Sequence, residues 1–140
     1  MVAYTSTVTS TGGRNGHIES DDGLLSADVA MPKSMGGTGD ATNPEQLFAG
    51  GFAACFGSAV MGVAKKHKAE LSDDDVKVVA TVGIGQNATG GFELTLKLEV
   101  EIAGVDQDTA EAIAASAHKV CPYSNATRGN IDVDVTAKAV

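Results

Sequence analysis

A run of 17 residues without a charge, Phe48–Ala64, constrains the fold of this chain more than any other feature. A stretch of this length is at the lower limit for a helix that crosses a membrane. It contains several glycines and alanines, and Ser58 interrupts its apolar character. We therefore favour a buried central helix, packed closely by its neighbours, over a membrane span.

Signals for the start of this helix lie just before the uncharged run. Asn43 can cap a helix, Pro44 suits the first helical position, and Gln46 completes a pattern like a capping box. The helix is expected to reach about Lys68, with a possible bend where two glycines adjoin at 50–51.

Alternating polar and apolar residues predict strands on both sides of this helix. The expected strands are 2–10, 17–19, 24–30, 76–86, 91–102 and 131–136. The first three would form an antiparallel meander, and the next two a hairpin. A second helix is expected from an N-cap near Asp108 and Glu111 to Pro122, which ends it. Residues 1–140 thus predict a single α+β domain.

The charge balance argues against two classes of partner. Ten basic residues are outnumbered by eighteen acidic ones, which gives a formal net charge of −8. A protein that binds nucleic acid or an anionic membrane needs a positive surface, so we expect neither. The first residues have neither the basic nor the apolar segment of a signal peptide, so a cytoplasmic location is expected.

The two cysteines are the strongest chemical signal. Cys55 lies inside the uncharged run, and Cys121 lies where the second helical pattern stops. In a reducing cytoplasm, such cysteines are often catalytic or redox-active. The sharpest hypothesis is a peroxide-reducing thiol with a distant resolving partner. The alternative is that both thiols simply pack in the core.

A reactive Cys55 needs a positive charge nearby, because burial in apolar surroundings raises a thiol pKa. The only arginines are Arg14, in a glycine-flanked loop, and Arg128. Either could instead form a surface ion pair. Glu45 is the obvious carboxylate to orient an arginine, and its alternative role is a first-turn acid favoured by the helix dipole.

The spacing of Glu45 and Cys55 adds a constraint. Ten residues of straight helix rise about 15 Å, so these two side chains cannot share one site along an unbroken helix. Either the helix breaks at its glycine pair, or Glu45 serves a site in a second subunit. We favour the second alternative, and so an obligate homodimer with composite sites.

Other patterns in the sequence give weaker evidence for a functional site. His17, His67 and His118 show no metal-ligand spacing, so no metal site is expected. Ser124 has no evident histidine and acid partners for a hydrolase triad. The residues after Cys121 suggest a rigid turn that aims its thiol.

Taken together, several segments resemble the organic hydroperoxide resistance family within the OsmC-like superfamily. They are Thr42–Phe48, Ala53–Phe56 and Val120–Asp132, with support from Pro32, Lys33 and Met35–Gly37. The resemblance spans nearly the whole chain. It implies antiparallel sheets around a long central helix, in an intertwined homodimer with its sites at the subunit interface.

The resemblance also implies a cysteine-based organic hydroperoxide reductase, acting in defence against oxidative stress. Cys55 would be the peroxidatic thiolate and Cys121 the resolving cysteine that forms a disulfide with it. Arg14 would stabilise the thiolate, held in place by Glu45. The family uses no metal, flavin or haem, and dithiols, typically protein-bound dihydrolipoyl groups, reduce its members.

An alkyl tail of the substrate needs an apolar pocket. The residues expected to provide it are Met35, Leu47, Phe48, Phe52 and Phe56. Three alternatives stay open from the sequence: a cysteine redox sensor, a structural stress protein, and a member of the general osmotic-stress branch of the superfamily.

Overall fold

The computed structural model describes all 140 residues of the chain. They form two compact units, Met1–Leu47 and Phe48–Val140. The long helix α1 (Pro44–Ala64) begins in the first unit and continues into the second. The expectation of a single domain over 1–140 stays a prediction.

The first unit contains a small antiparallel sheet. Its strands are β1 (Val8–Thr11), β2 (His17–Ser20) and β3 (Ser26–Asp28), in the order β1-β2-β3. Two short 3-10 helices accompany it, η1 (Gly13–Asn15) and η2 (Lys33–Met35). The predicted meander is therefore present. Its outer strands are shorter than expected, because β2 pairs with β1 only from Val8 onward and with β3 over three residues.

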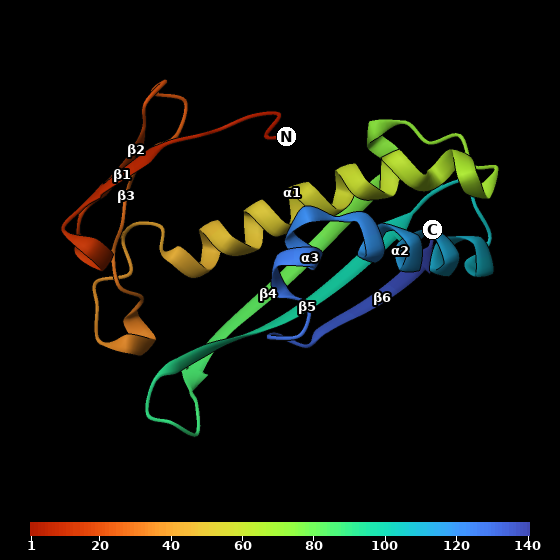
Figure 1. Cartoon of the computed structure of the whole chain (residues 1–140). Helices are drawn as coiled ribbons and strands as arrows, with labels where there is room; N and C mark the ends of the chain where they lie inside the picture. The colour runs from red at the N-terminus through yellow and green to blue at the C-terminus, as the bar shows by residue number, and fades with distance from the viewer. The chain divides into compact units, whose positions relative to one another are not determined.

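The second unit is built on a three-stranded sheet with the order β4-β5-β6. Its strands are β4 (Val76–Gln86), β5 (Phe92–Ile102) and β6 (Val133–Ala139). The helices are the continuation of α1, then α2 (Gln107–Val120) and α3 (Pro122–Thr127), with short 3-10 helices η3 (Lys65–His67) and η4 (Asp73–Asp75). Figure 1 shows the long β4–β5 hairpin with the helices of this unit on one side of it.

The second sheet corrects the expectation of purely antiparallel sheets. β4 and β5 are antiparallel, but β6 runs parallel to β5. The reason lies in the connection. The chain passes through α2 and α3 after β5, and these helices carry it back along the sheet, so that β6 starts opposite Leu96 and runs in the same direction as β5. A crossover of this kind joins parallel strands.

Alternation along β5 places the core on one face of the sheet. Leu98 and Ile102 are completely buried, whereas Lys97 and Glu99, which point to the other face of the sheet, are exposed. From α1, Phe52 and Phe56 are completely buried in the same core cluster. By length and composition Pro44–His67 could cross a membrane; Phe52, Phe56, Val60 and Val63 of this helix belong to the buried core cluster.

The helix α1 starts where the sequence predicts. The Asn43 side chain accepts a hydrogen bond of 2.8 Å from the backbone N–H of Gln46. The helix then runs without interruption through Gly50 and Gly51, so the glycine pair does not break it. It ends at Ala64, before the predicted end, because a 3-10 turn and Lys68 in the left-handed region (φ 59°) follow.

The cap of α2 differs from the prediction. Asp106, rather than Asp108, is the N-cap, and its carboxylate accepts a 2.8 Å hydrogen bond from the backbone N–H of Thr109. Pro122 ends α2 as expected, since the residue before a proline avoids helical geometry. The turn expected after it is a short helix, α3.

This cap generates a stability prediction. Asp106→Ala should lower the free energy of unfolding by about 1 kcal/mol, the usual value of an N-cap. Asp108→Ala removes a neighbouring acid with no capping hydrogen bond, so it should cost less. Urea unfolding of both variants measures the difference, and equal losses would contradict the assignment of the cap.

Candidate active site

The two cysteines meet in the second unit, although 66 residues separate them. The Cys121 sulfur lies 3.8 Å from the Cys55 sulfur, and both thiols are free. Cys55 projects from the interior of α1 and is partly buried, whereas Cys121 is completely buried at the junction of α2 and α3. The pair is thus close enough for a disulfide, after an approach of somewhat under 2 Å to the usual S–S length of about 2.05 Å.

Local geometry explains why Cys121 faces α1. Pro122 forces Cys121 out of helical geometry, to φ −61° and ψ 125°. The Cys121 N–H still donates to the Ala117 carbonyl (2.8 Å), and the Cys121 carbonyl accepts from the Asn125 N–H (2.9 Å). Both helices therefore fix the backbone of this one residue.

Within the second unit, the surroundings of Cys55 oppose ionisation. Burial is the main cause that raises the pKa of its thiol, and the neighbouring Cys121 adds to the rise. The backbone N–H of Tyr123 acts in the opposite direction, because it can donate to the thiolate. No cationic group acts on the thiol within these surroundings.

Tyr123 packs closely over α1 beside the thiols. Its ring lies edge-on to Phe52, with centroids 5.5 Å apart, and 6.3 Å from the ring of Phe48. A Cβ atom at Gly51 would lie 2.9 Å from the Tyr123 hydroxyl oxygen. Gly51 therefore provides space for Tyr123, whose hydroxyl would have to shift if a side chain were present here.

A cavity of about 290 Å³ lies next to this aromatic cluster. Its lining is Phe48, Tyr123, Ala126, Thr127, Asn130 and Ile131. Of the five residues expected to hold an alkyl tail, Phe48 lines this cavity. Phe52 and Phe56 are completely buried in the core of the same unit. Met35 and Leu47 belong to the first unit.

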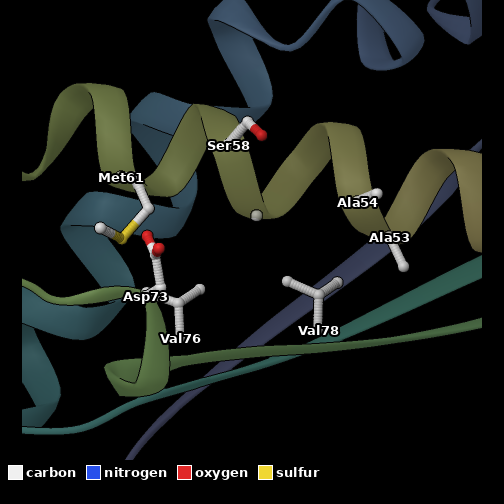
Figure 2. A pocket seen from close by; sticks show the side chains of 8 residues that line it. Ala53, Ala54, Ser58, Met61, Asp73, Val76 and Val78 are labelled. Atoms are coloured by element: carbon white, nitrogen blue, oxygen red, sulfur yellow. The ribbon is translucent and has the colours of Figure 1, made fainter.

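A second cavity, of about 330 Å³, lies between α1 and β4. Figure 2 shows the small side chains of Ala53 and Ala54 on the helix and those of Val76 and Val78 on the strand. Met61 and Asp73 also line the cavity (Figure 2). No residue predicted for the site lines this cavity.

Arg14 and Glu45 form a two-pronged ion pair in the first unit. The guanidinium Nη1 and Nη2 donate to the two carboxylate oxygens at 2.8 Å and 2.7 Å. Glu45 lies in the first turn of α1, and its side chain is only 15% exposed. The Arg14 guanidinium holds the pKa of the Glu45 carboxyl below its usual value, and Glu45 raises the pKa of Arg14.

The loop that carries Arg14 depends on glycine. Gly12 and Gly13 on its N-terminal side have φ of 81° and 55°, a region that favours glycine. On the other side, a Cβ atom at Gly16 would lie 1.7 Å from the Thr11 carbonyl oxygen, so no other residue fits. The tight turn from β1 to β2 thereby presents the arginine at its tip.

The other arginine is engaged elsewhere. Arg128 donates from its guanidinium to the side chain of Asn125 and to the backbone carbonyl of His118. Both partners lie beside the junction of α2 and α3. Arg128 therefore fastens this junction.

Sequence reasoning missed the histidine partner of Ser124. The imidazole Nδ1 of His118 lies 2.9 Å from the Ser124 hydroxyl oxygen, so the expectation of no such partner was wrong. A hydrolase triad still lacks its acid, since no carboxylate bonds to His118. No group of three or more His, Cys, Asp or Glu side chains is arranged to hold a metal.

Known proteins similar to this chain were identified at the levels of family, sequence and structure. The family described as OsmC-like protein matches residues 37–136. An organic hydroperoxide resistance protein of Xanthomonas axonopodis pv. citri is 48% identical, over 96% of this chain and 94% of that protein. The organic hydroperoxide resistance protein OhrB of Bacillus subtilis is 45% identical, over 99% of this chain and 100% of that protein.

The fold is likewise similar to that of a solved relative. The crystal structure of an organic hydroperoxide resistance protein from Legionella pneumophila superposes with a TM-score of 0.93 and 49% sequence identity. The match covers 99% of both chains. This likeness bears out the α+β class with a long central helix.

The Arg14–Glu45 pair generates a prediction for titration. Arg14→Gln should raise the pKa of the Glu45 carboxyl toward its usual value, because the hydrogen-bonded cation is lost. Carboxyl NMR signals followed against pH measure this shift. Asp22 is the control, because its pKa is lowered by the hydroxyl of Ser20 and should not change.

The same pair sets a direction for stability against pH. A carboxyl whose folded pKa lies below its unfolded pKa stabilises the fold above the unfolded value. That contribution falls as the pH falls through the folded pKa. Arg14→Gln should flatten this part of the acid unfolding curve, and an unchanged curve would contradict the pairing in solution.

Proposed function

This chain belongs to the OsmC-like family, and from that premise we propose that it is a cysteine-based peroxidase that reduces organic hydroperoxides to alcohols. The single observation that carries the proposal is the approach of two free thiols to 3.8 Å from opposite parts of the sequence. The names of the relatives at 45–48% identity supply the substrate class. The role in the cell would be defence against oxidative stress.

In the first step, the Cys55 thiolate attacks the distal oxygen of the hydroperoxide. A sulfur–oxygen bond forms, the O–O bond breaks, and the alkoxide leaves and takes up a proton to give the alcohol. Cys55 is thereby oxidised to a sulfenic acid. The cost of this step lies in forming the thiolate, since apolar burial raises the pKa of Cys55.

Arg14 is proposed to supply the missing positive charge. It would lower the pKa of Cys55 and stabilise the charge that develops on the departing alkoxide. Two facts support Arg14 over the other arginine. Its guanidinium is already oriented by the Glu45 carboxylate, and the family resemblance assigns this role to the arginine of the loop, whereas Arg128 bonds within the α2–α3 junction.

In the second step, the Cys121 thiol attacks the sulfenic sulfur of Cys55. The S–S bond forms and the S–O bond breaks, so hydroxide leaves and combines with the Cys121 proton as water. An external dithiol, which we propose to be a protein-bound dihydrolipoyl group, then reduces the disulfide by exchange. No metal, flavin or haem takes part in these steps.

An apolar pocket is proposed to select bulky substrates. The cavity beside Phe48 and Tyr123 is the space proposed for an alkyl tail, and Met35, Leu47, Phe52 and Phe56 would complete its surroundings. Each methylene buried there contributes about 0.8 kcal/mol. Equal efficiency on hydrogen peroxide and an alkyl hydroperoxide would contradict this selection.

A homodimer is proposed as the working form. The helix α1 is unbroken through its glycine pair, which supports a second subunit over a break that would bring Glu45 to the thiol on the same helix. Glu45 and Arg14 would then serve a composite site that two subunits share. A cytoplasmic location is proposed, and no nucleic acid or membrane partner is proposed for this acidic chain.

Variants of the two cysteines test the function. Cys55→Ser should abolish turnover of an alkyl hydroperoxide, because the attacking sulfur is gone. Cys121→Ser should complete one oxidation per chain and then stall or over-oxidise. Stopped-flow consumption of peroxide, with titration of free thiols before and after one equivalent, measures both results.

The same experiment separates the alternatives. A redox sensor or a structural protein would react slowly or not at all under these conditions. A member of the osmotic-stress branch would react with a different preference among peroxides. Turnover retained by Cys55→Ser would remove the proposed mechanism altogether.

The role of Arg14 has its own test. Arg14→Gln should slow the first step by about 100-fold, the usual effect of losing one stabilising donor, and should raise the pH at which Cys55 is alkylated. Arg14→Lys keeps the charge but not the planar set of guanidinium N–H donors, so an intermediate rate is expected. A rate unchanged in Arg14→Gln would move the role to Arg128 or another group.

A further inference from the structure

We propose that the hydrogen bond between His118 and Ser124 positions Cys121 for its attack on oxidised Cys55, and thereby sets the rate of disulfide formation. This inference rests on the proposed peroxidase function and adds two positioning residues to it. Neither residue touches the reacting oxygen in this role. Both act through the backbone that carries the resolving thiol.

The position of the bond along the chain is the first support. His118 lies in the last turn of α2 and Ser124 in α3, and Cys121 lies midway between them. The 2.9 Å contact from the His118 Nδ1 to the Ser124 hydroxyl oxygen closes a loop of seven residues around the thiol. A short closed loop leaves its central residue little freedom.

Burial is the second support. Ser124 is completely buried, so its hydroxyl cannot form a hydrogen bond to bulk water and needs a partner within the protein. His118 is half-buried, and its ring lies 6.4 Å from the ring of Phe56, the residue after Cys55. The same imidazole therefore contacts the segment of each cysteine.

A third support is the way in which Arg128 holds the other side of the junction. Its guanidinium bonds to the His118 carbonyl and to the Asn125 side chain, and its backbone N–H donates to the Ser124 carbonyl at 3.0 Å. The guanidinium bonds join the end of α2 to α3, the backbone bond closes the end of α3, and none of them contacts either sulfur. Their combined effect is to fix the angle between the two helices, at whose junction Cys121 lies.

The required motion shows why this constraint matters for rate. The sulfurs are 3.8 Å apart, and a disulfide needs about 2.05 Å. A misplacement of about 1 Å can cost 100-fold in a reaction between held groups. A junction that varies in angle would spread the Cys121 sulfur over such distances, whereas the fastened junction keeps it within one short approach.

His118 is not assigned as an acid or base. Burial and the charge of Arg128 lower its pKa, so the ring is neutral near neutral pH. Its Nδ1 is occupied by Ser124. The role follows from the geometry of the hydrogen bond. A side chain that cannot change its protonation state should serve equally well if it kept the same bond to Ser124.

The test compares the two chemical steps in Ser124→Ala. With tert-butyl hydroperoxide as the probe, the first step is measured as single-turnover peroxide consumption in a Cys121→Ser background. The second is measured as the appearance of the Cys55–Cys121 disulfide in the otherwise unchanged chain. We expect the first step to be unchanged and disulfide formation to slow by about tenfold or more, with more sulfinic acid at Cys55 at equal peroxide.

Ser116→Ala is the matched control. Ser116 is also a serine bonded to a histidine, since His67 Nε2 lies 2.8 Å from its hydroxyl oxygen. That bond fastens α2 to η3 rather than to the junction that carries Cys121. Both chemical steps should keep their rates in Ser116→Ala, even if its free energy of unfolding falls.

His118→Phe provides a second route to the same loss. A phenyl ring keeps the contact with Phe56 but cannot bond to Ser124. If the two residues act as a pair, the double variant should form the disulfide no more slowly than either single variant. His118→Gln, which retains a hydrogen-bonding group, should recover part of the rate.

The outcomes are distinct. An unchanged rate of disulfide formation in both Ser124→Ala and His118→Phe would overturn the inference, and so would an equal loss in both chemical steps or a loss equal to that of Ser116→Ala. If the wild-type chain fails to consume the peroxide or to form the disulfide, the proposed function itself fails. Far-UV circular dichroism before each assay identifies any variant that does not fold, and the other variant then decides.

Discussion

The contact between the α2–α3 junction and the middle of α1 is the interaction on which the rest of this site depends. It brings Cys121 to Cys55, places Tyr123 over Gly51, and directs a backbone N–H toward the Cys55 sulfur. Each of these consequences requires the chain to stop one helix at Val120 and start another at Pro122. A proline at that point ensures the stop, and a glycine on α1 allows the approach.

This contact also creates the electrostatic difficulty that the chemistry must solve. Packing the junction on α1 removes water from Cys55 and raises the pKa of its thiol. A rise of one unit in the thiol pKa lowers the thiolate population at neutral pH about tenfold, which corresponds to about 1.4 kcal/mol. The dipole of α1 offers little help, because its effect is confined to the first turn and Cys55 lies well inside the helix.

Much of the fold followed from the sequence, because the relevant signals are local. The capping side chain of Asn43, the alternation along β5 and the proline at 122 each act over a few residues, and each lies where it was expected. The direction of β6 depends instead on a crossover of about thirty residues, which no local pattern encodes. Asp106 was missed because Asp108 gave an equally good local signal, and only the backbone decides between them.

The same distinction applies to the site. Both cysteines and the Arg14–Glu45 pair were named from the sequence, mainly through a family resemblance, and the geometry brings the members of each pair together. The bond from His118 to Ser124 gave no signal, because a histidine and a serine six residues apart do not face each other on a continuous helix. They meet only because the chain turns between them. The role of Gly51 was likewise hidden, since a glycine in a helical pattern first suggests a bend rather than space for a ring.

The geometry of the Arg14 guanidinium bears on how one ion pair could serve two purposes. A guanidinium has five N–H donors, and Glu45 accepts from Nη1 and Nη2. Three donors remain for a thiolate or a peroxide oxygen, in a plane that the carboxylate has already fixed. The carboxylate cancels part of the positive charge, but it also removes the rotational freedom that a free arginine would lose on binding. In the proposed mechanism, the pair therefore gives up some electrostatic strength and gains orientation, which is the more useful quantity where the reacting oxygen must lie in line with a single sulfur.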